Sequence, residues 1–355
     1  MPADHVHFNG SVNLDDAESV MREIAARIPS GLRRIPDGET GDRGNWIYFQ
    51  LQKFLQLPWL VPTRPLDAAD GEYDQLPQLR LADGTDPAQV SWPDLGYADA
   101  YLGSYKVFAA LREQGVIPPG VRFQVEYPTP LASISGYIVP EQQQALLDSY
   151  ERAMFADLDR LLAAVPADEV AVQWDVAVEF GILEEAFAPG GAQAFDAIIA
   201  ALARCVDQVP AGIPVGLHLC YGDYGHQHFM QPESLALQVR VLNAVTAAAG
   251  RPVSFVSFTV PQDQREESYF APLAGLAGLA ADPVTELNFA LVPYHPAEQA
   301  QGTTRDQVRF IDAALAASPG GRRDWGICTE CGMGRVSRDE ILALLDLHRQ
   351  VIAAR

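Results

Sequence analysis

The chain has 355 residues, of which 48% are hydrophobic and 20% charged, the balance of an ordinary globular protein. Its formal net charge of −21 disfavours nucleic-acid phosphates and anionic lipid as partners. An apolar run of about 18 residues, which a membrane span requires, does not occur. The N-terminal stretch also lacks the basic and apolar segments of a secretory signal, so we expect a cytoplasmic protein.

The predicted elements alternate between strand and helix along most of the chain. Two upstream strands are expected at 5–11 and 31–37, with a helix near 15–28 between them. Six more strands are expected at 121–127, 169–175, 213–219, 252–258, 286–292 and 323–329. Helices should follow them near 140–164, 191–208, 232–249, 268–281, 304–317 and 337–353. Eight strand–helix units favour a closed (β/α)8 TIM barrel of the α/β class, and an open doubly wound sheet is the alternative.

Residues 50–119 interrupt this alternation. They are rich in Pro, Gly and aromatic residues, with one helix-like stretch near 98–115. We therefore interpret 1–355 as a single barrel domain with an insertion after the second strand. Such an insertion at the catalytic face is often a lid, although a packing excursion explains it equally well.

Ionisable and thiol side chains gather where the predicted strands end. The first strand ends at Ser11, the second runs into Glu39, the fourth ends at Asp175, and the seventh is followed by His295. The carboxyl ends of barrel strands meet at one rim, where active sites lie. Burying these groups without partners would be costly, so the sequence predicts a site at that rim.

Three of these side chains have the chemistry of a zinc site. His218 and Cys220 are two residues apart at the end of the fifth strand, so both should face the same direction. Cys331 follows the eighth strand and would approach them across the rim. Thiolate and imidazole ligands favour zinc over magnesium or calcium, and three protein ligands leave a fourth position for substrate or water. We therefore predict Zn²⁺ bound by His218, Cys220 and Cys331.

The other cysteines leave several alternatives open. Cys328 and Cys331 form a CxxC pair, in which both bind metal, only Cys331 does, or the two form a redox couple. We expect Cys328 to lie in the strand core and Cys205 on the apolar face of a helix. The nearby His226 and His228 fit surface or supporting roles better than metal ligation.

Several segments resemble a known family in sequence order. GLHLCYGD (216–223) and TECGMGR (329–335) resemble the two zinc-ligand segments in the catalytic barrel of cobalamin-independent methionine synthase. That family belongs to a superfamily shared with uroporphyrinogen decarboxylase. HFNGS (7–11), PDGETGDRGNWIYF (36–49), VQWDVAVE (172–179) and YHP (294–296) resemble further segments of the family. The resemblance spans nearly the whole chain apart from 50–119.

The resemblance implies a methyl- or alkyltransferase that binds a small-molecule thiol and an alkyl donor. It implies substrate-binding roles for Glu39 and Asp175, a site position for the Gly-Ser pair ending at Ser11, and a histidine near the site at His295. The family also has a zinc-binding glutamate at the end of the sixth strand, where this chain has none before Glu266. The fourth zinc position is therefore open, or filled by water, Asp263 or a substrate thiol.

The expected chemistry is attack by a zinc-bound thiolate on an electrophilic carbon. A free thiol has a pKa of about 8.5, and zinc favours its deprotonated form. His295 is a candidate general acid, while Glu39 and Asp175 would bind a cationic amine or transfer protons. A rim hydrogen-bond network to nearby arginines is the alternative for both carboxylates. Trp46 and Tyr127 are candidate pocket walls, although core packing explains such aromatics equally well.

Two other function classes remain open at this point. One is lyase chemistry on the same barrel, either C–S cleavage or a decarboxylation of the uroporphyrinogen type. The other is a non-catalytic barrel that binds zinc or another ligand. The sequence does not specify an oligomeric state, and a homo-oligomer is compatible with it.

Overall fold

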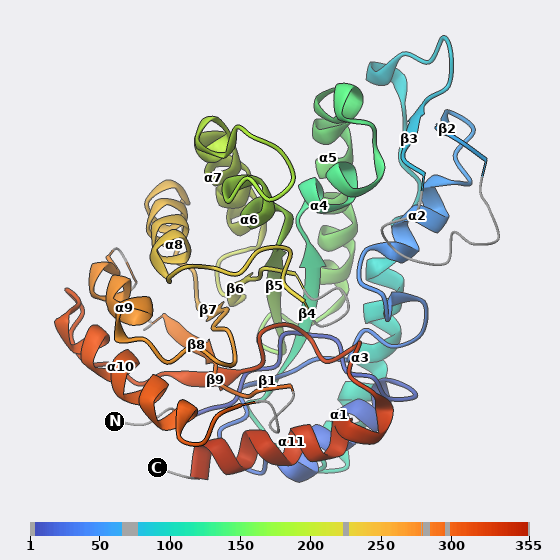
Figure 1. The fold of residues 1–355 in the computed structure, drawn as a ribbon. Coiled ribbons are helices and arrows are strands. Elements are labelled where there is room, and N and C mark those ends of the chain that lie inside the picture. The colour runs from blue at the N-terminus through green and yellow to red at the C-terminus, as the bar shows by residue number, and fades with distance from the viewer. Residues whose placement is uncertain are drawn as a thin grey trace.

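The centre of the molecule is a curled parallel sheet of seven strands (Figure 1). The computed structural model describes residues 4–65, 77–222, 227–277, 279, 285–294 and 299–353. The sheet order is β1–β4–β5–β6–β7–β8–β9, with every neighbouring pair parallel. Its strands are β1 (Arg34–Ile35), β4 (Arg122–Pro128), β5 (Val170–Val176), β6 (Val215–Leu219), β7 (Phe255–Phe258), β8 (Glu286–Ala290) and β9 (Gly326–Cys328).

Helices cover the outside of this sheet, as Figure 1 shows. The longer ones are α1 (Ala17–Arg27), α3 (Tyr97–Glu113), α5 (Pro140–Ala164), α7 (Gly191–Gln208), α8 (Ala236–Ala248), α10 (Thr303–Ala317) and α11 (Arg338–Ala353). The shorter ones are α2 (Tyr48–Phe54), α4 (Pro130–Tyr137), α6 (Val178–Leu183) and α9 (Glu267–Phe270). The predicted α/β alternation is therefore confirmed. None of the described helices is both long and apolar enough to cross a membrane.

One predicted helix is much shorter than expected. Instead of a helix near 268–281, the structure has α9 followed by a short 3-10 helix, η3 (Ala271–Gly275). Pro272 lies in the first turn of η3, where its missing N–H group prevents a continuous α-helical ladder from α9. Part of the predicted range lies outside the described residues.

The first predicted strand, 5–11, forms isolated bridges instead of a regular ladder. Val6 pairs in parallel with Leu32, just before β1, and with Ile327 of β9, so it contacts both edges of the sheet. Farther along this segment, side-chain hydrogen bonds take the place of the backbone hydrogen bonds of a strand ladder. The backbone oxygens of Phe8 and Asn9 accept hydrogen bonds from the side-chain amides of Gln124 and Gln173. The structure thus shows a seven-stranded curled sheet in place of the expected eight regular strands.

The 50–119 insertion includes a small antiparallel hairpin, β2 (Leu60–Pro62) with β3 (Leu79–Leu81), apart from the main sheet (Figure 1). Aromatic rings attach this region to α5. Trp92 lies edge-on to Trp59 and to Tyr150, with ring centroids 4.8 Å apart in both pairs. A second link runs from the Val139 N–H to the Leu79 carbonyl. The hairpin and the Trp92 segment are thus packed on the α4–α5 side, while the role of the insertion at the site stays a prediction.

Candidate metal centre

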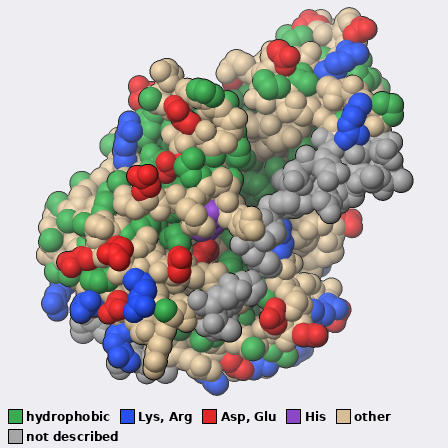
Figure 2. Space-filling view, in the orientation of Figure 1, with side chains coloured by type: hydrophobic (Ala, Val, Ile, Leu, Met, Phe, Trp, Pro, Cys, Tyr) green, Lys and Arg blue, Asp and Glu red, His purple; other side chains and the backbone are tan. Residues whose placement is uncertain are grey.

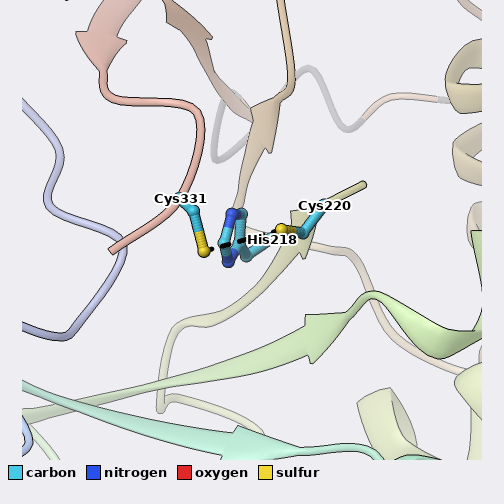
Figure 3. Close-up of side chains that lie close together, drawn as sticks. All are labelled: His218, Cys220 and Cys331. Carbon is cyan, nitrogen blue, oxygen red and sulfur yellow. Dashed lines mark hydrogen bonds between the residues drawn. The ribbon is translucent and has the colours of Figure 1, made fainter. Parts of the chain in front are cut away.

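The side chains of His218, Cys220 and Cys331 converge at the carboxyl ends of β6 and β9 (Figure 3). One potential ligand atom from each residue lies within 4.8 Å of the other two, and the two sulfur atoms are 3.7 Å apart. His218 and Cys220 are buried, and Cys331 is half-buried. Because β6 lies between β5 and β7 while Cys331 follows the edge strand β9, only the curling of the sheet brings the three together.

Asp175 fixes the orientation of the His218 ring. The His218 Nδ1 lies 3.2 Å from Asp175 Oδ1, and Nε2 lies 3.2 Å from the Glu330 carbonyl oxygen. Asp175 pairs with His218 in the β5–β6 ladder, so the sheet register itself places the carboxylate beside the ring. Burial lowers the pKa of His218, but the hydrogen bond and charge of Asp175 outweigh it and raise the pKa to about 9. A metal ion would compete with a proton for Nε2.

Hydrogen bonds also hold both cysteine-bearing loops. The Gly222 N–H lies 3.3 Å from Cys220 Sγ, an arrangement that stabilises a thiolate. The Cys331 N–H donates to Tyr294 Oη (2.8 Å), and the Tyr294 hydroxyl donates to the Gly332 carbonyl (3.0 Å). These bonds fix the loop that carries Cys331.

A second contact joins the two loops to each other. His228 Nε2 lies 2.6 Å from Glu330 Oε2, and both side chains are largely buried. His228 follows β6 and Glu330 follows β9, so this pair links the segments that carry Cys220 and Cys331. The sequence assigned His228 only a surface or supporting role, and it could not reveal the partner because 102 positions separate the pair.

The donor set fits zinc. One imidazole nitrogen and two thiol sulfurs are ligands that zinc prefers, and a three-ligand site leaves one position open. Among the described residues, this trio is the group of His, Cys and acidic side chains close enough to hold an ion. Cys328 is not part of it, and burial raises the pKa of its thiol well above the usual range. Of the three alternatives for the CxxC pair, the geometry favours the one in which Cys331 binds metal and Cys328 does not.

A cluster of buried carboxyl groups lies beside the trio. Glu39 accepts a hydrogen bond from Ser11 Oγ (2.6 Å), and Ser11 N–H neighbours the Gly332 backbone of the Cys331 loop. A Cβ atom built on Gly10 would lie 3.0 Å from Glu126 Cγ and 3.5 Å from Glu39 Oε2, so both carboxyl groups approach this glycine. The absence of a side chain at Gly10 therefore makes room for them.

Burial dominates the electrostatics of these carboxyl groups. It raises the pKa of Glu39 to about 7, helped by the charge of Asp175 and opposed by Arg43 and the Ser11 hydrogen bond. It also raises the pKa of Glu126 well above its ordinary value. Arg43 forms an ion pair with Asp37, whose other oxygen accepts the Glu39 N–H (2.9 Å). That contact supports Glu39 in a left-handed backbone conformation (φ 49°), which is unusual for a residue with a side chain.

Of the other predicted site residues, some lie beside the trio and one does not. Ser11, Glu39 and Asp175 lie beside the trio as described above, whereas Tyr127 is buried on the helix side of β4. Its hydroxyl donates to Asp157 of α5 (2.9 Å), and its ring packs on Tyr97 of α3. Alternation along β4 explains this, because Glu126 takes the interior face and Tyr127 the opposite one. The core-packing alternative therefore describes Tyr127.

Trp46 and His295 complete the predicted set. Trp46 is partly exposed before α2, with its backbone in the left-handed region (φ 50°) and its ring packed against the core. His295 lies outside the described residues. Glu126 and Arg43 belong to the carboxyl cluster but were not among the predicted site residues. Glu126 ends the third predicted strand, which was an available signal, while the burial of Arg43 depends on tertiary packing.

The face shown in Figure 2 is hollowed near its centre, where a histidine side chain is visible. Acidic and basic side chains are interspersed around the hollow.

Comparisons with known proteins place the fold. No protein-family model matches the sequence, and no curated protein matches it. A solved structure from Listeria monocytogenes, named as a candidate vitamin-B12-independent methionine synthase, is similar with a TM-score of 0.55. The two chains are 11% identical, and the alignment covers 99% of this chain and 98% of the other. At this identity the likeness shows a shared fold and does not by itself transfer an activity.

Proposed function

We propose that this protein is a zinc-dependent alkyltransferase, related in mechanism to methionine synthase, that activates a small-molecule thiol. The observation that carries the proposal is the convergence of His218, Cys220 and Cys331 within 4.8 Å of one another. Zinc supplies Lewis-acid stabilisation of a thiolate at neutral pH. The name of the Listeria protein agrees with this assignment, and its fold matches along nearly the whole chain.

Each side chain of the site has a separate task in this proposal. With Asp175 holding the Nδ1–H of His218, Nε2 is the nitrogen that would bind the metal, in place of its contact with the Glu330 carbonyl (3.2 Å), while the Gly222 N–H stabilises the Cys220 thiolate. Glu39, positioned by Ser11, supplies negative charge for a cationic group such as the amine of an amino-thiol. His295 keeps its predicted role as general acid for the leaving group.

We also infer that residues 5–11 close the sheet into a (β/α)8 barrel. Val6 contacts the segment before β1 and also β9, the two edges that closure must join. In addition, the His7 N–H donates to the Ile327 carbonyl, and the Ile327 N–H donates to the His5 carbonyl. A closed barrel explains how Cys331 reaches His218 across the mouth, and it makes the chain one domain with the 50–119 insertion.

The carboxyl cluster argues against a decarboxylase of the uroporphyrinogen type. Such an enzyme needs positive charge to bind substrate carboxylates, whereas Glu39, Glu126 and Asp175 converge here. Arg43, which the described residues place beside these carboxyl groups, is already paired with Asp37. The proposal also includes a cytoplasmic location and, as small-molecule partners, a thiol and an alkyl donor.

Metal analysis of the purified protein tests the proposal directly. We expect about one zinc ion per chain, and Cys220→Ala and Cys331→Ala should each lose most of it because three ligands become two. Cys205→Ala is the matched control, since Cys205 is a buried free cysteine of α7 outside the trio. Retention of full zinc by both ligand variants would refute the assignment.

A second measurement tests thiol activation. X-ray absorption at the zinc edge should show an added sulfur ligand when the correct thiol binds to the wild-type protein. If zinc is present but no candidate thiol adds a sulfur ligand, the site is a structural or storage metal site instead.

A further inference from the structure

A buried glutamine lies directly behind the Asp175–His218 pair. Gln173 is on β5, two residues before Asp175, and is fully buried. Its side-chain Nε2 donates to Asp175 Oδ1 (2.9 Å) and to the Asn9 carbonyl (3.1 Å). Because both of these oxygens can only accept, the NH₂ group must point toward them and the Oε1 atom must point away.

His7 fixes the other end of the glutamine. The His7 Nε2 atom lies 2.8 Å from Gln173 Oε1, and both side chains are buried. Oε1 is an acceptor, so Nε2 of His7 must carry the hydrogen. Burial, aided by the charge of Arg34, lowers the pKa of His7 well below its ordinary value, which keeps the ring neutral. These three hydrogen bonds therefore leave the Gln173 amide one favourable orientation.

Asp175 Oδ1 receives hydrogen bonds from both sides. Gln173 donates on one side and the Nδ1–H of His218 on the other. The chain His7–Gln173–Asp175–His218 thus runs along the interior of the sheet to the predicted metal ligands. The hydrogen bonds in it place the hydrogen of His218 on Nδ1, so Nε2 is the nitrogen that a metal would bind, replacing the hydrogen that faces the Glu330 carbonyl (3.2 Å).

We propose that Gln173 is a positioning residue of the metal centre, which sets the Asp175 carboxylate so that His218 presents Nε2 to zinc. This inference rests on the proposed zinc site. It assigns a measurable effect on metal affinity to an uncharged core residue that is not itself a predicted ligand.

The chain contains a matched control on the neighbouring strand. Gln124 of β4 is also fully buried, donates to the carboxylate two residues later (Glu126 Oε1, 2.8 Å) and donates to the Phe8 carbonyl (2.7 Å). Among the described residues, no hydrogen bond or ion pair joins Glu126 to His218. Loss of Gln124 therefore removes the same kind of buried amide without touching the metal ligand.

The test compares Gln173→Met with Gln124→Met, since methionine keeps the length of the side chain and removes its hydrogen bonds. Zinc affinity is measured by competition with a chromogenic chelator, and folding is checked by circular dichroism. We expect Gln173→Met to bind zinc about 10-fold to 100-fold more weakly, the range for groups that orient metal ligands. Gln124→Met should change affinity less than about threefold, because its carboxylate partner does not orient a ligand.

A double-mutant cycle shows whether the effect passes through Asp175. In an Asp175→Asn background, Gln173→Met should add little further loss, because the carboxylate that it orients is already gone. The visible absorption of the Co²⁺-loaded protein should also change in Gln173→Met and stay the same in Gln124→Met. If Gln173→Met does not fold, His7→Leu replaces it, since it removes the hydrogen bond that orients Gln173, and zinc binding should weaken in the same non-additive way.

The outcomes separate this inference from the proposed function. Wild-type protein that binds no zinc overturns both. Wild-type protein that binds zinc, with equal affinities for the two glutamine variants or additive losses with Asp175→Asn, overturns only the role of Gln173. A selective, non-additive loss in Gln173→Met supports it.

Discussion

Replacing Glu39 by glutamine should change the pH dependence of stability in a defined direction. Glu39 is only 4% exposed, and burial together with the charge of Asp175 raises its pKa from an ordinary 4.5 to about 7. The folded protein therefore binds this proton more tightly than the unfolded chain does. The stabilisation from the protonated form is complete below pH 4.5 and is lost as the pH rises through 7.

The size of the effect follows from the two pKa values. Between pH 5 and pH 8, ionisation of Glu39 should lower the free energy of unfolding by up to about 2.5 kcal/mol, at about 1.4 kcal/mol per pKa unit. Glu39→Gln cannot ionise and should not show this loss. The variant should therefore gain stability relative to wild type as the pH rises.

Urea unfolding at several pH values between 5 and 8 measures the difference. Glu286→Gln is the control, because Arg34 and Arg33 overcome the effect of burial and lower the pKa of Glu286 to about 2. The stabilisation from ionised Glu286 is lost only as the pH falls below 4.5. The destabilisation caused by Glu286→Gln should therefore be constant between pH 5 and pH 8. A difference between wild type and Glu39→Gln that does not change with pH would refute the assignment of a raised pKa to Glu39.

Three further substitutions probe other parts of the molecule. Arg34→Met should lower the free energy of unfolding by about 3 kcal/mol by leaving the carboxylate of Glu286 without its most buried partner, while zinc content stays unchanged. Gly332→Ala should cost about 1–3 kcal/mol. It should also weaken zinc binding, because its Cβ would lie 2.7 Å from Ser11 Oγ and displace the neighbouring metal loop. Trp92→Ala should speed proteolysis of the insertion without changing zinc content, since its ring contacts attach that region to α5; unaltered cleavage would argue against that attachment.

The periodicity of the sequence was sufficient to predict most of the fold. Strands at 121–127, 169–175 and 213–219 appear as β4, β5 and β6 with boundaries shifted by at most two residues. These strands are buried on both faces, and their β-branched and aromatic residues indicate strand even where polar residues such as Gln124 and Gln173 interrupt the apolar run. The first strand was harder to predict, because side-chain amides replace part of its ladder and their positions depend on distant strands.

The sequence also contained the identities of the metal donors. His218 and Cys220 share a face because of strand alternation, and Cys331 follows a strand end, so the trio could be inferred from local patterns. Thiolate and imidazole chemistry then limited the choice of metal. The ligand roles themselves stay predictions until metal is measured.

Only the tertiary structure decided which groups support those donors. Gln173 is held by His7 and by the Asn9 carbonyl, and His228 pairs with Glu330; these contacts join segments far apart in the chain, and no residue pattern encodes such distances. The tertiary structure also placed Tyr127 in the layer between sheet and helices, because strand alternation puts Glu126 and Tyr127 on opposite faces without specifying which face turns inward. Local order determines which side chains share a face, whereas the curling of the sheet determines what that face meets.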